Sequence, residues 1–195
     1  TDSAKFPTTA GTYPANAGND HDIFVLKLGP DGKTIEYASF LGGLDYDIGK
    51  GIAVDGQGQA YITGVTYSSG FPVTTGAIGR NYKGVGDAFA VKLSGTGDKV
   101  LYSTYLGGSH DDMGQGIAVD AQGQAHIAGR TWSPDFPITQ GAYGKASIGD
   151  ADAFVAKLSD NGDYMVYSTY LGGRGSDDGT SIALDGEGDA YVTGQ

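Results

Sequence analysis

Short runs of alternating hydrophobic and polar residues recur along the chain, and each run predicts a β-strand. In residues 87–93, for example, Phe89, Val91 and Leu93 share one face of an extended chain, and the intervening residues lie on the other. The strands expected in this part of the chain are 87–93, 100–106, 116–120 and 125–130. Because no segment keeps a helical period over several turns, the pattern predicts an all-β protein.

The same pattern occurs three times in register. Thr1, Thr66 and Thr131 open units of equal length, with no insertion or deletion between them. The three units are residues 1–65, 66–130 and 131–195. A fixed period of this length predicts one continuous repeat array. Each unit is expected to supply four antiparallel strands, the number in one blade of a β-propeller.

Glycine and aspartate turns separate the strands. Asp55, Asp120 and Asp185 each begin a tight hairpin between the third and fourth strands of a unit. The third strand, at 116–120 in the second unit, is small and apolar on both sides, so we expect it in a crowded centre. The longer Gly-rich stretch after each Phe-Pro pair is expected to cross to the next sheet.

The motifs resemble a known repeat. Asp-Ala-Phe-Val-Ala-Lys-Leu at 152–158, Tyr-Ser-Thr-Tyr-Leu-Gly-Gly at 167–173, Ile-Ala-Leu-Asp at 182–185 and Ala-Tyr-Val-Thr-Gly at 190–194 are similar to the bacterial β-propeller repeat called SBBP. The Thr-x-Ser-x-x-Phe-Pro element at 131–137 belongs to the same pattern. The resemblance covers the whole chain and implies propeller-like blades in large secreted or surface-exposed proteins. It implies no particular reaction.

By analogy with related propellers, the Ile-Ala-Val-Asp strand is innermost and the Tyr-Leu-Gly-Gly strand is outermost. The chain then carries an outer strand pair near its start and an inner pair near its end, which are complementary halves of one blade. Unpaired strand edges favour pairing with another chain. We therefore expect copies of the chain to associate, either head to tail as a filament or as a two-chain ring. An excised segment of a longer repeat protein has the same appearance.

The amino-acid composition limits the expected partners and the expected cellular location. The net charge of −11 and the pI near 4.4 argue against nucleic acid and anionic membrane surfaces as partners. No apolar run is long enough to span a bilayer, so membrane insertion is not expected. No signal peptide is visible, which fits either a cytosolic or an already processed chain. Because the chain is rich in Thr, Tyr, Gly and Asp and has few Lys, its composition resembles that of secreted or cell-surface proteins.

Aspartates recur in register at two places in each unit. One set stands at Asp-Ile-Phe or Asp-Ala-Phe, just before the strand that carries the phenylalanine, and the other set follows the Gly-Gly turn. The six residues are Asp22, Asp47, Asp87, Asp112, Asp152 and Asp177. Clustered carboxylates beside glycine carbonyls offer the oxygen ligands that calcium prefers, so these six are candidate calcium ligands. The alternative, which the sequence favours, is that each carboxylate accepts backbone N–H groups in a turn.

No residue set predicts catalysis. His21, His110 and His126 occupy different positions in the repeats and form no zinc spacing, so a surface or turn position is expected for them. Ser103 and Ser168 lie within expected strands and have no paired base. Because the units are nearly alike, they leave little room for distinct catalytic residues, and the chain is not expected to be an enzyme.

Aromatic residues recur as well. Two sets in the second expected strand could form a surface that stacks on sugars, but packing between blades is the favoured interpretation. These sets are Tyr37, Tyr102 and Tyr167, and Phe40, Tyr105 and Tyr170. The aromatic residues that do not repeat, Tyr46, Tyr67 and Trp132, are better candidates for a specific contact. The main hypothesis is a non-catalytic extracellular structural protein that associates with itself, and the alternative is a propeller fragment of an adhesin that binds glycans or proteins.

Overall fold

The computed structural model describes residue 1, residues 6–9 and residues 21–195. Twelve β-strands and no helices occur in these residues. The strands are β1 (Ile23–Leu28), β2 (Ile35–Leu41), β3 (Asp47–Val54), β4 (Ala60–Thr66), β5 (Asp87–Leu93), β6 (Val100–Leu106), β7 (Asp112–Val119), β8 (Ala125–Thr131), β9 (Asp152–Leu158), β10 (Met165–Leu171), β11 (Gly179–Leu184) and β12 (Ala190–Gly194). The predicted all-β class is confirmed.

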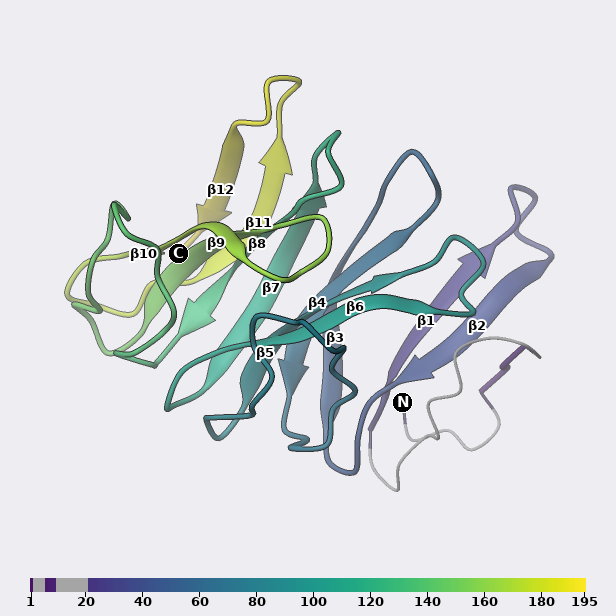
Figure 1. The fold of residues 1–195 in the computed structure, drawn as a ribbon, viewed down its shortest axis with the longest axis horizontal. Helices are drawn as coiled ribbons and strands as arrows, with labels where there is room; N and C mark the ends of the chain where they lie inside the picture. The colour runs from purple at the N-terminus through teal and green to yellow at the C-terminus, as the bar shows by residue number, and fades with distance from the viewer. Residues whose placement is uncertain (2–5, 10–20) are drawn as a thin grey trace.

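The strands form four antiparallel sheets. β3, β4, β5 and β6 pair in that order, as do β7, β8, β9 and β10, while β1–β2 and β11–β12 are two-stranded. Figure 1 shows the sheets side by side, with β1–β2 in purple at one side and β11–β12 in yellow at the other. The four-stranded sheets are blades, and the two-stranded sheets are the expected half-blades. We call β1–β2 the N-terminal half-blade and β11–β12 the C-terminal half-blade.

The innermost strands of successive sheets lie next to one another, because β3 contacts β7 and β7 contacts β11. The predicted order, with the Ile-Ala-Val-Asp strand at one edge and the Tyr-Leu-Gly-Gly strand at the other, is confirmed. Each full blade therefore combines the last two strands of one sequence unit with the first two strands of the next unit.

The connection between sheets was predicted in the wrong place. Residues 67–86, which include the Phe-Pro pair, link β4 to β5 within one sheet, and residues 107–111 make the crossing from β6 to β7. The long loop stays with its own sheet because its phenylalanine is packed there. The Phe71 ring lies 4.9 Å from the Phe89 ring and 6.1 Å from the Tyr105 ring, both in strands of that sheet.

Strand bounds were predicted best where turn residues flank an alternating run. β5 and β6 have the predicted bounds, but β7 begins at Asp112, four residues before the predicted start at Gly116. The pairing of β7 with β8 shifts register between Gly114 and Gly116. A bulge between two glycines removes the regular alternation on which the prediction depended.

The recurring aromatic side chains form the core, which confirms the packing interpretation. The buried members are Tyr37, Phe40, Tyr102, Tyr105 and Tyr170. The Tyr105 hydroxyl donates to the Ser68 carbonyl at 2.8 Å, and the Tyr170 hydroxyl donates to the Ser133 carbonyl at the same distance. Each full blade thus buries its aromatic rings, and the Tyr105 and Tyr170 hydroxyls are satisfied in the same way.

Candidate interface and carboxylate sites

One edge of strand β1 in the N-terminal half-blade differs from the corresponding edges of β5 and β9 in the full blades. In the full blades, β5 pairs with β4 and β6, and β9 pairs with β8 and β10. β1 occupies the equivalent place but pairs only with β2 among the described residues. Likewise β12, the counterpart of β4 and β8, pairs only with β11 in the part of the chain that the structure describes. Each half-blade therefore presents a strand edge that is paired in the full blades.

Side chains on these edges are exposed where their repeat counterparts are buried. Phe24 in β1 is 51% exposed, whereas Phe89 in β5 and Phe154 in β9 are fully buried. Tyr191 in β12 is 64% exposed, whereas Tyr61 in β4 is fully buried. The same residue types in the same sheet positions thus differ only in whether a neighbouring strand pair covers them.

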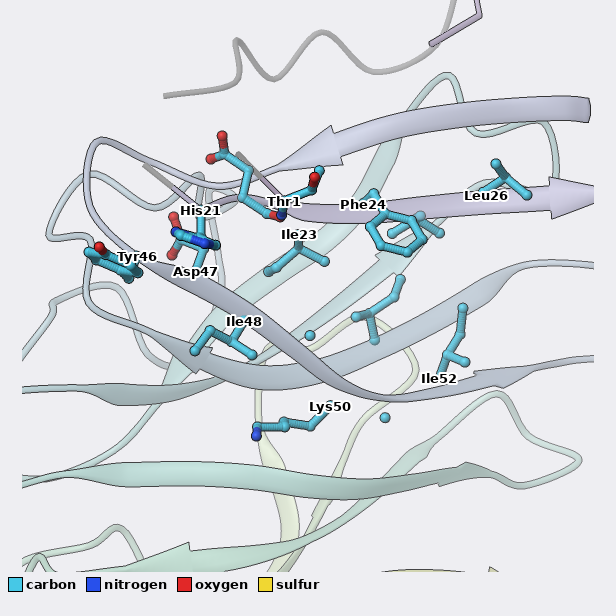
Figure 2. A pocket seen from close by; sticks show the side chains of 15 residues that line it. Thr1, His21, Ile23, Phe24, Leu26, Tyr46, Asp47, Ile48, Lys50 and Ile52 are labelled. Atoms are coloured by element: carbon cyan, nitrogen blue, oxygen red, sulfur yellow. The ribbon is translucent and has the colours of Figure 1, made fainter. Parts of the chain in front are cut away.

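A groove of about 740 Å³ lies between β1 and β3. Figure 2 shows Ile23, Phe24 and Leu26 of β1 along one side and Ile48 and Ile52 of β3 along the other. The lining is largely apolar, and Ile52 is 58% exposed although its counterpart in β7 is buried. Inner strand pairs cover this position in the full blades, so the groove has the location that an inner pair would fill.

The predicted aspartates meet in pairs, one residue from each set. At each Gly-Gly turn, two carboxylates approach the same side of the first glycine. Oδ1 of Asp87 and Oδ2 of Asp112 lie 2.4 and 2.8 Å from the point where a Cβ atom would stand on Gly107. The equivalent pairs are Asp22 with Asp47 at Gly42, and Asp152 with Asp177 at Gly172. Only glycine fits here, because any side chain would occupy the space of the carboxylates.

Most of these carboxylates accept hydrogen bonds from turns, as the alternative interpretation predicted. Oδ2 of Asp112 accepts from the backbone N–H of Gly108 at 2.7 Å and from the Ser133 hydroxyl at 2.8 Å. Asp87 accepts from two backbone N–H groups of the preceding loop. Oδ2 of Asp152 accepts from the preceding loop in the same way. The second oxygen is buried without a hydrogen-bond partner among the described residues in Asp47, Asp112 and Asp152.

Burial changes the acidity of these groups. Desolvation raises the pKa of Asp112 to about 6, against hydrogen bonds from Thr131, Gly108 and Ser133 that lower it. Burial likewise raises the pKa of Asp47 and of Asp87. Two carboxylates that converge at a buried turn are therefore suited to sharing a proton or a cation. No group of three or more His, Cys, Asp or Glu residues with metal-binding geometry occurs in the part of the chain described.

A second cluster of polar side chains lies near the β7–β8 hairpin. It includes one histidine that was expected at the surface or in a turn. His126 is fully buried in β8 rather than at the surface or in a turn. Its Nδ1 lies 3.1 Å from the Tyr167 hydroxyl, and its Nε2 lies 3.3 Å from Oδ2 of Asp120. Burial lowers the pKa of His126. The Nζ atom of Lys157 also contacts Oδ2 of Asp120, at 2.8 Å. Tyr61 occupies the same repeat position as His126. A comparison of the repeats would therefore have predicted a core position for His126.

The non-repeating aromatic residues gather on one rim. The Tyr67 amide donates to the Tyr46 carbonyl at 2.9 Å, and the Trp132 amide donates to the Asp111 carbonyl at the same distance. The Tyr46 ring stacks on the His21 ring, with centroids 5.1 Å apart. These side chains lie at the ends of β3, β4, β7 and β8 that face away from the Asp-Gly hairpins. The rim therefore carries different aromatic residues on a backbone contact that recurs with the 65-residue period.

Comparison with known families agrees with the architecture. A family model described as SBBP, a beta-propeller repeat, matches residues 36–72, 101–137 and 166–195, which is more than half of the chain. The chain belongs to the SBBP β-propeller repeat family. The matched segments start 65 residues apart, which is the period of the sequence units. A search of curated proteins found no match. The described residues include no helix with the length and hydropathy needed to cross a membrane.

Proposed function

We propose that this β-propeller repeat protein is a non-catalytic, extracellular structural protein whose copies associate through their complementary half-blades. The C-terminal half-blade of one copy would complete the N-terminal half-blade of another, and the product would be a filament or a closed two-chain ring. The observation that carries the proposal is the contrast between Phe24 and Tyr191, which are exposed, and their counterparts Phe89 and Tyr61, which are buried.

The internal blades supply the register of the proposed junction. Ile62 of β4 pairs with Val91 of β5. The residue two repeats after Ile62 is Val192, and the residue one repeat before Val91 is Leu26. The same pairing therefore places Val192 of one copy opposite Leu26 of the next. The junction would add one pair of strands to the groove beside β1 and would cover Phe24. Burying apolar surface and pairing free backbone groups both stabilise such an addition.

Cross-linking tests this register directly, because the chain has no Cys of its own. A variant with both Leu26→Cys and Val192→Cys is expected to form a ladder of disulfide-linked multimers, or a linked dimer, on mild oxidation. Leu26→Cys alone is the matched control, since a head-to-tail contact does not bring two copies of residue 26 together. Sedimentation velocity and electron microscopy of the unmodified chain should show concentration-dependent rings or filaments. Isolated monomers at high concentration would overturn the proposal.

The proposed extracellular location is supported by the richness in Thr, Tyr, Gly and Asp with few Lys, and by the setting that the family resemblance implies. Labelling of intact cells of the native host with a membrane-impermeant amine reagent tests it. Labelling of this protein on intact cells is expected, and labelling only after lysis would contradict the location.

A second candidate function, binding of glycans or of a surface protein, is favoured by the rim that carries the non-repeating residues. Tyr46 is exposed there, and the guanidinium of Arg130 lies 4.0 Å from the centre of the Trp132 ring. Exposed aromatic rings beside charged groups suit stacking on sugars or peptides. A glycan array tests this candidate. Signals that disappear in Tyr46→Ala and persist in Tyr143→Ala, an exposed tyrosine elsewhere, would support it, and an array without signals would remove the sugar form.

Calcium at the paired aspartates is a further proposal. Each pair offers two carboxylates, and Oδ1 of Asp152 is a buried acceptor without a hydrogen-bond partner among the described residues. The pair supplies a minority of the six to eight oxygen ligands that calcium takes, so backbone carbonyls would have to provide others. A bound ion would offset the repulsion within each pair. Added calcium should raise the melting temperature and a chelator should lower it, whereas an unchanged transition would remove the idea.

A further inference from the structure

Successive sheets contact one another through an aromatic ring that fills the space beside a glycine. The ring of Tyr37 in β2 lies 2.5 Å from the point where a Cβ atom would stand on Gly97, in the β5–β6 hairpin. The ring of Tyr102 in β6 lies 2.6 Å from the equivalent point on Gly162, in the β9–β10 hairpin. Both glycines have positive φ angles, 70° and 68°. The outer strand of one sheet is thus joined to the outer hairpin of the next in the same way twice.

The third tyrosine and the third glycine of this series are not in contact with each other. Tyr167 in β10 occupies the position of Tyr37 and Tyr102, but it fills no such space beside a glycine in the described residues. Gly32 in the β1–β2 hairpin occupies the position of Gly97 and Gly162. It has the same backbone conformation, with a φ of 67°, and nothing lies within 4 Å of its Cβ position.

We propose that Tyr167 of one copy packs over Gly32 of the next copy, as a second contact of the junction beside the pairing of β12 with β1. This inference rests on the proposed self-association and specifies how the two copies fit. The shift by whole repeats that places Val192 opposite Leu26 also places Tyr167 over Gly32. The two internal contacts are the templates, because they join the same residue types with the same backbone geometry.

Charge complementarity supports the same fit. Lys92 and Lys157 occupy the same position in successive repeats. Each side chain extends from its strand toward the neighbouring strand or the hairpin of that strand. Lys92 Nζ lies 5.0 Å from the centre of the Tyr61 ring, and Lys157 Nζ lies 2.8 Å from Oδ2 of Asp120. Lys27 holds this position in β1, where its Nζ instead contacts Glu36 at 2.7 Å.

The residues that would receive Lys27 are present on the other half-blade. The Tyr191 hydroxyl donates to Oδ2 of Asp185 at 3.2 Å, as the Tyr61 hydroxyl donates to Oδ2 of Asp55 at 3.1 Å. In the proposed register Tyr191 stands opposite Lys27, so an exposed cation meets an exposed carboxylate. The contact joins two different surfaces, and it is therefore head to tail and heterologous.

Gly32→Asn tests the tyrosine contact. Asparagine tolerates a left-handed backbone, and its side chain has open space in the isolated chain, so the variant should fold normally. In the junction the new side chain would collide with the Tyr167 ring, and association should weaken roughly tenfold or more. Gly141→Asn is the matched control, because Gly141 also has a positive φ and nothing within 4 Å of its Cβ position.

The outcomes separate this inference from the proposed function. If the unmodified chain stays monomeric in sedimentation experiments, the self-association itself fails. If it associates, and Gly32→Asn associates as strongly as Gly141→Asn, the tyrosine contact alone is overturned. The double variant Tyr167→Ala/Gly32→Asn gives the second measurement, because every junction that it forms lacks the ring and carries the asparagine. Removal of the ring should restore part of the lost affinity, and strictly additive losses would contradict the contact.

Discussion

Phe24 and Phe89 hold the same position in two repeats and lie in different surroundings. Phe89 has a strand on each side of β5 and is fully buried, while Phe24 keeps its contact with Phe6, at 4.6 Å between ring centroids, and is half exposed. The half-blade thus retains the packing within its own sheet and lacks the packing from the neighbouring strand pair. The comparison teaches that much of each blade's core is completed by adjacent strand pairs and sheets.

The sharpest way to test this comparison is to truncate both rings. Phe89→Ala should lower the free energy of unfolding by about 3–5 kcal/mol, because it leaves a cavity in a close-packed core. Phe24→Ala should cost about 1 kcal/mol or less in the dilute monomer, since much of its ring already contacts water. Urea denaturation at low protein concentration measures both values. Equal losses would show that Phe24 is as well packed as Phe89.

A pH titration compares a buried carboxylate with an exposed one. The pKa of Asp112 rises from an ordinary value of 3.8 to about 6 on folding, so its contribution favours the folded state most below about pH 4. That contribution is lost as the pH rises through about 6, and it amounts to at most about 3 kcal/mol. Asp112→Asn should remove this dependence, which is read as the difference between the two stability curves.

Asp185 gives the control with the opposite sign. Hydrogen bonds, above all from the backbone N–H of Asp189, lower its pKa, so its contribution is present above the ordinary pKa and is lost as the pH falls. A curve for Asp112 with the sign of Asp185 would contradict the burial argument. It would instead support a bound cation, which keeps the Asp87–Asp112 pair ionised in the folded state.

The smallest effect is expected for the lysines. Lys157→Met should lower stability by about 1–2 kcal/mol, because Asp120 and Lys157 form a largely buried ion pair that also involves His126. Lys27→Met should leave the monomer's thermal denaturation unchanged, since the Lys27–Glu36 pair is exposed. It should, however, weaken self-association. A matching loss of stability in both variants would contradict the assignment of Lys27 to the junction.

Much of the fold could be predicted because its determinants are local and repeated. Alternation between flanking turns predicted β5 and β6 to the residue, and the analogy with related propellers predicted the order of strands in each sheet. The crossing was predicted wrongly because loop length is a poor guide when a ring such as Phe71 holds the loop to its own sheet. The start of β7 was missed because a bulge between glycines interrupts the alternation.

The candidate sites were predicted less completely because they depend on contacts between distant residues. The sequence identified both aspartate sets, but their convergence at Gly107 and its equivalents follows from how β5, β6 and β7 meet. His126 was expected at the surface or in a turn because the three histidines occupy different repeat positions, although its repeat counterpart Tyr61 is buried in the core. The role of Gly32 becomes visible only when Gly97 and Gly162 are found beside tyrosine rings.

The use of one tyrosine–glycine contact at successive sheets has a consequence for how such an array changes over generations. Recombination between copies of a gene segment adds or removes whole multiples of the repeat. Because Tyr37 meets Gly97 with the same geometry as Tyr102 meets Gly162, a gain or loss of one unit recreates these adjoining surfaces without compensating substitutions. The length of the array can therefore drift while its fold stays intact.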